Sequence, residues 1–491
     1  MRPLVLAASL ALATASCGAD WPQWGGSPTH SGTTQAETVL TPANVSGLHP
    51  LFTASLPDTA DGAPAYRSRV QRASGKRDLL FVTTRSGDLV ALDAHRGTRV
   101  WQKHFRSATC RINHGGTPCY TTSSPAIDPS GLYVYSYGLD GKVHKVATGT
   151  GTQVVDAHWP EVTTLKGYDE KGSSALTIAT TKSGQSYLYV THAGYPGDGG
   201  DYQGHITVIN LKYGSQRTFN TLCSNQAVHF AGGGASPDCP QVQSGVWARA
   251  GVVYDSATSR VYFSSGNGTY APASHHWGDT VGAIYPNGKG NANGDPLDAY
   301  TPTNYLQLQQ FDIDLGSTAP AILPLTDTRW VRNLGVQSGK DGNLRLLNLR
   351  NLSGHRAPGF TGGQVGPVVP VPQGGEVLTT PVVWTNPADG STWVFVANDN
   401  GTSALRVVFT ASGAPMLSKR WQINRPGTTP VVANGVIFIA SGTRIGAYNA
   451  KTGASRWQDT SLSSLHWQSP IVVNGVVYIE DGQAKLHAYV R

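Results

Sequence analysis

Charged side chains are scarce in this sequence of 491 residues. Only 14% are Asp, Glu, Lys or Arg, and 37 basic against 30 acidic residues leave a net charge of +7. No run of Lys or Arg exceeds two residues, so the sequence predicts no specific nucleic-acid partner. Methionine occurs only 2 times, whereas 58 Gly and 30 Pro supply many turns. This composition argues against both a helical bundle and a disordered tail.

Several catalytic motifs and long apolar runs are also missing. The sequence contains no GxSxG, HExxH or phosphate-loop pattern, so serine hydrolase, zinc protease and nucleotide-dependent activities have no support. The main apolar run lies within residues 1–17, which carry Arg2 and end in small residues before Cys17. This segment predicts a signal peptide, shorter than the ~20 residues that a spanning helix needs, and hence an exported protein.

Cysteine is rare, at 5 residues. Four of these form two close pairs, Cys110 with Cys119 and Cys223 with Cys239. In an oxidising compartment such pairs predict two local disulfides. Cys17 is then the odd one.

The residues around Cys17, Ala-Ser-Cys-Gly, resemble a bacterial lipoprotein box. We therefore expect lipidation of Cys17, with ordinary cleavage after Ala15 as the alternative. Residues 18–48 are polar and rich in Gly, Ser and Thr, which predicts a flexible strap between anchor and domain. The location is then the periplasm, cell envelope or exterior, with membrane contact only through the anchor.

A repeat runs through the rest of the chain. Its clearest copy, residues 87–101, reads GDLVALDAHRGTRVW, and residues 442–457 repeat it as GTRIGAYNAKTGASRW. Each copy has a turn Gly, an alternating strand, a second turn and a strand ending in Trp, which predicts antiparallel strands. Eight copies of about 55 residues each fit four-stranded blades of a β-propeller. They begin near residues 87, 123, 186, 248, 335, 379, 428 and 468.

The last copy is incomplete, because it stops at Arg491 without its Trp-bearing strand. The extended segment 51–56, LFTASL, precedes the first complete copy and can supply that strand. We therefore predict an all-β, eight-bladed propeller of four-stranded antiparallel blades over residues 49–491. Its amino-terminal strand pairs with residues 485–490 and closes the last blade.

The blade pattern of Gly, alternating apolar residues, Asp, Thr-Gly and Trp resembles the tryptophan-docking repeat of pyrroloquinoline quinone (PQQ) propellers, the quinoprotein alcohol dehydrogenase superfamily. It also resembles their cofactor-free relatives, the outer-membrane assembly lipoproteins. Residues 21–32, WPQWGGSPTHSG, are similar to the segment that opens many such chains. The resemblance implies the fold, but blade-forming residues are present with or without a cofactor.

The resemblance implies a set of site residues if the chain is an enzyme. Asn267 in SSGNGTY matches the asparagine that binds Ca²⁺ in the family, and Lys340 matches the cation that faces the quinone. The Gly-rich loop 195–204 offers Asp198 and Asp201 as further metal ligands, although such a loop is also typical of a surface turn. Trp247 and Arg249 are expected either to wall the cofactor site or to pack between blades.

Two departures from the family pattern weaken the enzyme interpretation. The adjacent cysteine pair that often covers the quinone is absent. The spacing also puts Gln309 where the general base should stand, and an amide cannot accept a proton; Asp312 remains the candidate base because alignment of one sequence shifts by a few residues.

We therefore expect a ligand-binding, protein-binding or scaffold module of the cell envelope. Its partner would be a ligand, polymer or envelope protein, bound by a monomer. The alternative is a dehydrogenase dependent on PQQ and Ca²⁺ that oxidises an alcohol or sugar at the mouth of the central channel.

Overall fold

The computed structural model describes residues 19–106, 110–196, 198–325, 333–354 and 361–491. The signal segment and Cys17 lie outside these residues, so export and lipidation stay predictions. In the described part of the chain, no helix has the length and apolar character needed to cross a membrane.

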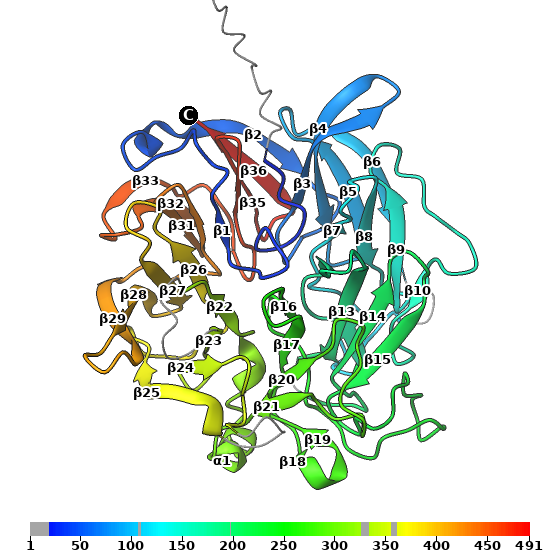
Figure 1. Cartoon of the computed structure of the whole chain (residues 1–491). Helices are drawn as coiled ribbons and strands as arrows, with labels where there is room; N and C mark the ends of the chain where they lie inside the picture. Colours follow the sequence, from blue (N-terminus) through cyan, green and yellow to red (C-terminus); the bar gives the residue numbers. More distant parts are fainter. Residues whose placement is uncertain (1–18, 107–109, 197, 326–332, 355–360) are drawn as a thin grey trace, which may run out of the picture.

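Eight antiparallel blades surround a centre, as the repeat count predicted (Figure 1). Blade 1 holds β3 (Ala65–Arg72), β4 (Gly75–Thr83), β5 (Asp88–Asp93) and β6 (Arg99–His104); blade 2 holds β7 (Ala126–Ile127), β8 (Tyr133–Tyr137), β9 (Lys142–Ala147) and β10 (Glu161–Val162). Blade 3 holds β11 (Glu170–Gly172), β12 (Thr177–Thr180), β13 (Ser186–Gly194), β14 (His205–Asn210) and β15 (Gln216–Asn220); blade 4 holds β16 (Val253–Asp255), β17 (Arg260–Ser264), β20 (Val281–Ile284) and β21 (Asp298–Tyr300).

The second half of the chain continues the ring. Blade 5 holds β22 (Ala321–Leu323), β23 (Leu334–Gln337), β24 (Asn343–Asn348) and β25 (Gln364–Pro370); blade 6 holds β26 (Val382–Thr385), β27 (Thr392–Asn398), β28 (Gly401–Phe409) and β29 (Pro415–Ile423). Blade 7 holds β1 (Thr33–Thr34), β30 (Val431–Ala433), β31 (Val436–Ser441), β32 (Arg444–Asn449) and β33 (Ser455–Asp459); blade 8 holds β34 (Ile471–Val473), β35 (Val476–Glu480), β36 (Lys485–Val490) and β2 (His49–Ser55).

Short elements decorate the blades. They are the hairpin of β18 (Tyr270–Ala271) and β19 (His276–Trp277), helix α1 (Tyr305–Gln310) and the 3-10 turns η1 (Val45–Gly47), η2 (Pro272–Ser274), η3 (Leu315–Ser317) and η4 (Thr361–Gly363).

The repeated Thr-Gly and Trp residues dock one blade on the next. Trp101 Nε1 of blade 1 donates to the carbonyl of Thr148 in blade 2 at 2.9 Å. Gly151 lies against that indole with φ +73°, and a Cβ there would sit 2.8 Å from the ring. Trp421 donates in the same way to Ala450 at 2.9 Å, and Gly453 faces its ring. Only glycine tolerates both the left-handed backbone and this close approach.

The ring closes as predicted. Strand β2 pairs antiparallel with β36, with Thr53 opposite His487 and Ser55 opposite Lys485. The amino-terminal strand therefore supplies the outer strand of blade 8, so the two ends of the propeller meet in one blade and the ring is closed.

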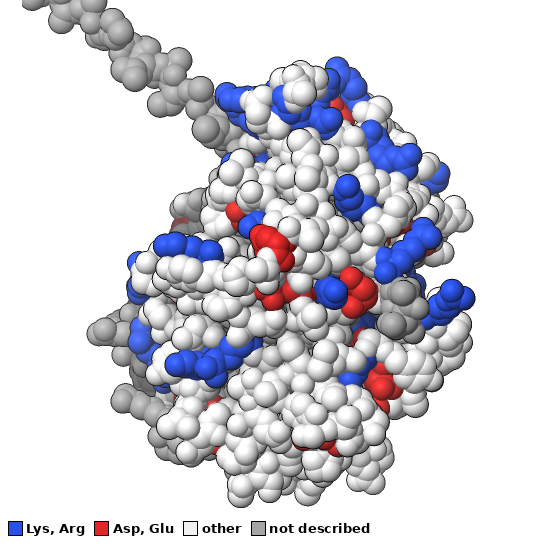
Figure 2. Space-filling view, turned by 90° about the vertical axis from the view of Figure 1, so that its right-hand side faces the viewer, with Lys and Arg blue, Asp and Glu red and all other residues white. Residues whose placement is uncertain are grey.

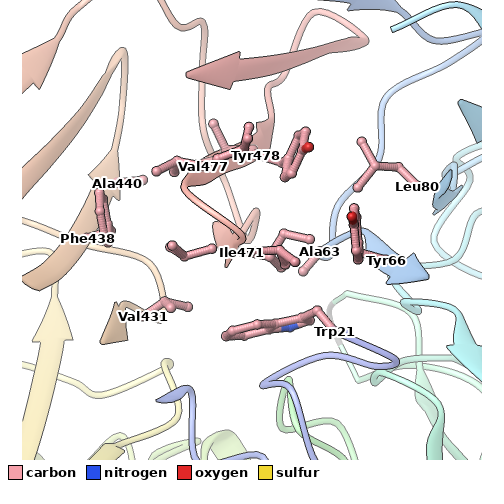
Figure 3. Packing of buried hydrophobic residues seen from close by; sticks show 14 of the residues in the cluster. Trp21, Ala63, Tyr66, Leu80, Val431, Phe438, Ala440, Ile471, Val477 and Tyr478 are labelled. Carbon is pink, nitrogen blue, oxygen red and sulfur yellow. The ribbon is translucent and has the colours of Figure 1, made fainter. Parts of the chain in front are cut away.

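The strap is packed against the ring, which corrects the expectation of a flexible tether for its described part. Trp21 and Trp24 are each 2% exposed, and Trp21 packs with Tyr66 and Tyr478 of blades 1 and 8 (Figure 3). Backbone carbonyls of the strap accept hydrogen bonds from the first strands of several blades. For example, the carbonyl of Pro22 accepts one from the N–H of Ile127 at 2.8 Å. The few apolar residues of this polar segment are buried against the blades, and its backbone is hydrogen-bonded to them. Burial and hydrogen bonding together hold the segment in place.

Charge is dispersed over the surface, as the sequence suggested. Figure 2 shows Lys and Arg side chains spread over one side of the molecule, with acidic side chains near the middle of the same side.

Candidate active site

Loops on one face of the ring build a central cavity. Strands within a blade alternate in direction, so the turn between the second and third strands emerges on the same face as the connection to the next blade. These loops enclose about 290 Å³. The central cavity is lined by Arg85, Tyr120, Thr122, Lys171, Ser173, Ala193, Gly194, Tyr195, Pro196, Asp198, Tyr202, Trp247, Arg249, Asp312, Asp314, Lys340, His466 and Trp467.

An acidic cluster holds Lys340 in the lining of the central cavity. Lys340 Nζ lies 2.5 Å from Asp314 Oδ2 and 3.1 Å from Asp312 Oδ1. Burial alone would lower the pKa of Lys340, but Asp314 and Asp312 outweigh burial and raise the pKa above its usual value. Lys340 Nζ also lies 5.6 Å from the centre of the Trp247 ring. The two carboxylates thus fix the ammonium group beside an aromatic wall.

Asn267 and Asp198 meet beside this cluster, although they lie far apart in the sequence. Asn267 Nδ2 is 3.5 Å from Asp198 Oδ2, and the Asn267 backbone N–H donates to Asp314 Oδ1 at 2.6 Å. Tyr202 donates its hydroxyl to Asp198 Oδ1 at 2.7 Å. The Asp198 carboxylate therefore lines the cavity with the Asn267 amide beside it, outside the lining residues, and carboxylate and amide groups carry the oxygen ligands that Ca²⁺ accepts.

Glycine makes the approach of Asp314 possible. A Cβ on Gly266 would stand 2.2 Å from Asp314 Oδ1 and 3.0 Å from Trp247 Nε1. The GNG sequence that contains Gly266 and Asn267 therefore serves packing as well as the site.

The structure does not bring every predicted residue to the central cavity. Asp201 is not among the lining residues and instead pairs with Lys166 Nζ at 3.1 Å. Gln309 lies in α1 and is also outside the lining, whereas Asp312 lines the cavity. The sequence-based placement of the Gln309 amide at the position of the general base is therefore wrong, and Asp312 is the candidate that lines the cavity.

A set of basic side chains, Arg85, Lys171 and Arg249, forms another part of the cavity lining. Arg249 is buried and donates to the carbonyl of Thr122 at 3.1 Å and to the carbonyl of Ser173. Lys171 Nζ donates to Ser173 Oγ at 2.9 Å. Arg85 stacks over the Tyr120 ring at 4.4 Å.

These cations are incompletely neutralised. Within the described residues, no ion pair joins Arg85, Lys171 or Arg249 to a carboxylate. The nearby carboxylate of Asp61 pairs instead with His466 Nδ1 at 2.9 Å. Burial, and then the charge of Arg249, lower the pKa of Lys171 to about 7, and burial lowers the pKa of Arg249 to about 10. This part of the cavity therefore favours a negatively charged ligand.

Aromatic rings supply the remaining walls. Trp247 is partly exposed to the cavity, and the Arg249 guanidinium lies 5.6 Å from the centre of the Trp467 ring on another side. Trp247 and Arg249, which the sequence left as either site or packing residues, thus both line the cavity.

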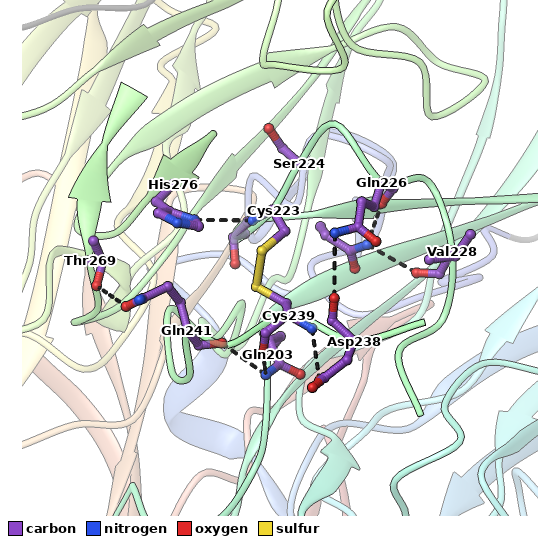
Figure 4. The surroundings of a disulfide bond; sticks show 12 residues. Gln203, Cys223, Ser224, Gln226, Val228, Asp238, Cys239, Gln241, Thr269 and His276 are labelled. Carbon is purple, nitrogen blue, oxygen red and sulfur yellow. Dashed lines mark hydrogen bonds between the residues drawn. A yellow bond between two sulfur atoms is a disulfide. The ribbon is translucent and has the colours of Figure 1, made fainter. Parts of the chain in front are cut away.

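The two predicted disulfides form, and each braces a loop that leads into the site. Cys110–Cys119 directly precedes Tyr120. Cys223–Cys239 lies in the connection that reaches Trp247 (Figure 4). Gln203 Nε2 donates to the carbonyls of Cys239 at 3.2 Å and Gln241 at 2.9 Å, which ties this loop to blade 3.

Sequence reasoning missed Lys171, Tyr120 and Trp467. A signal for the first two did exist, because Tyr120, Lys171 and Trp247 occupy the same position counted back from the first strand of the next blade. Aligning the repeats with one another would have placed Tyr120 and Lys171 beside Trp247.

Three solved structures that resemble this chain are alcohol or methanol dehydrogenases. A europium-containing methanol dehydrogenase is 14% identical with a TM-score of 0.64 over 96% of this chain and 98% of that one. Quinohemoprotein alcohol dehydrogenase ADHIIG from Pseudomonas putida HK5 is 14% identical with a TM-score of 0.64, over 96% and 80%. The enzyme from Comamonas testosteroni is 14% identical with a TM-score of 0.63, over 96% and 80%. At this identity the likeness shows the fold.

A search of curated proteins gave no match. The family model described as outer membrane protein assembly factor BamB matches residues 53–281 and 367–491, which is more than half of the chain. The chain therefore belongs to this family of PQQ-repeat β-propellers.

Proposed function

We propose that this protein is a PQQ-dependent dehydrogenase that oxidises an alcohol or sugar in the central cavity. The observation that carries the proposal is the division of charge in that cavity. Cations without carboxylate partners among the described residues line it together with a separate set of carboxylates, beside which the amide of Asn267 lies. A planar cofactor with several carboxylates and a bound cation needs this division.

The residues present fit such a cofactor. Arg85, Lys171 and Arg249 would hold its carboxylates, and Trp247 would stack on its ring. Asp198 and Asn267 would hold Ca²⁺ through oxygen atoms. When bound, PQQ with its cation supplies an acceptor for the two electrons and two protons of an alcohol.

The chain's own groups would orient the substrate and move a proton. The Asp312 carboxylate, with 61% of its side chain exposed, can accept a hydrogen bond and then the proton of a substrate hydroxyl. Lys340, held by Asp314, can donate a hydrogen bond to an oxygen that gains negative charge.

Export to the periplasm or exterior belongs to the same proposal. Two disulfides support an oxidising compartment. Lipidation of Cys17 remains a prediction for a residue outside the described part of the chain.

The second candidate is a binding or scaffold module of the envelope, which the description of the matched family favours. The missing adjacent cysteine pair favours it as well, since neither disulfide lies among the lining residues of the central cavity.

Two aspartates in one loop make a matched test. Purified protein is titrated with PQQ in the presence and absence of Ca²⁺, followed by quenching of tryptophan fluorescence. We expect Ca²⁺ to tighten PQQ binding by the parent and by Asp201→Asn. In Asp198→Asn, Ca²⁺ should no longer change PQQ binding. Equal responses of the two variants, or no saturable binding by the parent, would count against the proposal and favour the binding module.

A further inference from the structure

A second cavity lies on the same face as the central cavity and adjoins it. This side cavity encloses about 460 Å³ between loops of blades 5 to 8, within the ~300–1,000 Å³ typical of small-molecule sites. His466 and Trp467 line both cavities, so they form the wall between them. A ligand that passes this wall can occupy both spaces.

The side cavity presents hydrogen-bond acceptors and little positive charge. Glu376 and Asp399 line it with exposed carboxylates, and in the described part of the chain no hydrogen bond or ion pair engages either side chain. Among the described residues, its lining includes no Lys or Arg, and His466 is the one basic group. Such a surface repels anions and suits a ligand that donates hydrogen bonds through hydroxyl groups.

The polar framework behind these carboxylates is already satisfied. The Asn398 side-chain amide donates hydrogen bonds to the carbonyls of Gly374 and Glu376, at 2.8 and 3.0 Å. Thr428 donates its hydroxyl to the carbonyl of Gln468 at 2.7 Å. These bonds hold the loops in place, so Glu376 and Asp399 remain available to a ligand on a fixed scaffold.

A metal ion is a poor occupant of this cavity. Among the described residues, the only group of three His, Cys, Asp or Glu side chains with converging ligand atoms is Cys223, Cys239 and His276, which lies elsewhere and includes a disulfide. Glu376 and Asp399 therefore lack a third protein ligand of this kind.

An aromatic wall completes the pattern. The Trp467 indole is partly exposed, and the His466 ring lies 4.7 Å away, centre to centre. His466 Nδ1 pairs with Asp61, which fixes the orientation of the imidazole. A flat indole with acceptors nearby can stack on the apolar C–H face of a sugar ring while the ring hydroxyls donate to carboxylates.

We infer that the side cavity binds one ring of a neutral saccharide of at least two rings. This inference rests on the proposed function, because His466 and Trp467 border both cavities and the neighbouring ring would extend into the central cavity, which Asp312 lines. The substrate class of the dehydrogenase is accordingly a neutral oligosaccharide, with Glu376, Asp399 and Trp467 as its recognition residues.

Binding to the cofactor-free protein tests the inference separately from the enzyme proposal. Cellobiose, maltose and a disaccharide containing a uronic acid are titrated by calorimetry. We expect saturable binding of a neutral disaccharide, weakened about tenfold or more in Asp399→Ala. The matched control is Asp389→Ala, an exposed aspartate of blade 6 in the turn between β26 and β27, on the opposite face.

PQQ titration in parallel separates the two claims. Asp399→Ala should keep the parent's PQQ affinity, and Asp198→Asn should keep the parent's disaccharide affinity. In turnover assays Asp399→Ala should raise KM for the disaccharide about tenfold with kcat unchanged, and leave KM for a small alcohol unchanged. Absence of binding by both neutral disaccharides, preference for the uronic acid, or equal affinities of Asp399→Ala and parent would overturn the saccharide site.

Discussion

Replacing Lys171 with methionine should stabilise the protein and weaken its binding of PQQ. The buried ammonium of Lys171 has a pKa lowered to about 7, from 10.5 in an unfolded chain, first by burial and then by Arg249. Between about pH 7 and 10.5 the Lys171 amine is therefore protonated in the unfolded chain but mostly neutral in the folded protein, which opposes folding. Each pKa unit corresponds to about 1.4 kcal/mol, so near pH 7 the opposing term is on the order of 4 kcal/mol.

Relaxation of the surroundings reduces this unfavourable free energy of burying the Lys171 ammonium. In Lys171→Met, Ser173 also loses the hydrogen-bond donor that Lys171 provides. We therefore expect Lys171→Met to raise the free energy of unfolding by about 1–3 kcal/mol at pH 7. The parent's stability should rise with pH between about 7 and 10 through this group, because there the unfolded chain holds more protons. The variant should lack that contribution.

The effect on ligand binding has the opposite sign. A carboxylate of PQQ favours the charged amine, which is about nine-tenths populated at pH 6 and one-tenth at pH 8 when the pKa is about 7. PQQ affinity in the parent should therefore fall about tenfold between these pH values. In Lys171→Met the affinity should be low at both.

A second buried lysine provides the control. Lys166 pairs with Asp201 at 3.1 Å, so Lys166→Met should destabilise the fold by leaving its partners without a cation. Urea unfolding between about pH 7 and 10 and PQQ titration at pH 6, 7 and 8 measure these quantities. The reasoning is refuted if Lys171→Met destabilises as much as Lys166→Met and the pH dependence of PQQ binding survives.

Three further predictions concern the frame of the site. Trp21→Ala should lower the free energy of unfolding by about 3–5 kcal/mol, because the buried indole leaves a cavity; a loss below 1 kcal/mol in urea would mean that the strap is not part of the core. Replacing Cys223 and Cys239 together by Ser should cost about 2–4 kcal/mol and weaken PQQ binding, whereas thiol mass analysis that finds both cysteines free in the exported parent would contradict the disulfide. Cys17→Ser should release the protein from the membrane fraction, and equal release of the parent would leave export without a lipid anchor.

Much of the fold could be predicted because the residues that define each blade lie close together in the sequence. The Gly and Trp residues of each copy recur at regular spacing, and the truncated last copy requires a further strand, which the sequence places at 51–56 and the structure at His49–Ser55. The packing of the strap could not be predicted, because Trp21 and Trp24 stand among polar residues and their partners come from blades throughout the chain. An average composition hides such isolated anchors.

The candidate site was predictable only where a family motif marks a residue. Asn267 and Lys340 follow from the resemblance: Lys340 lines the cavity, and Asn267 lies beside it, hydrogen-bonded to Asp198 and Asp314. Asp198 and Asp201 look equivalent in the sequence, but the backbone separates them, with Asp198 at φ +50° directed to Tyr202 and Asp201 to Lys166.

Among the basic residues of the cavity, Arg249 was a candidate in the sequence, whereas Arg85 and Lys171 carry no family motif. Arg85, Lys171 and Arg249 come from loops of different blades, and only closure of the ring brings them together. A charge cluster of this kind is a property of the tertiary fold rather than of any sequence window.

Turnover by the reconstituted protein tests the central claim most directly. Purified protein is loaded with PQQ and Ca²⁺, and dye reduction is followed with alcohols, monosaccharides and neutral disaccharides. We predict dye reduction that saturates with substrate, requires PQQ, and falls at least a hundredfold in Asp312→Asn although that variant still binds PQQ. Binding of PQQ without turnover of any of these substrates, or equal turnover in Asp312→Asn, would contradict the account.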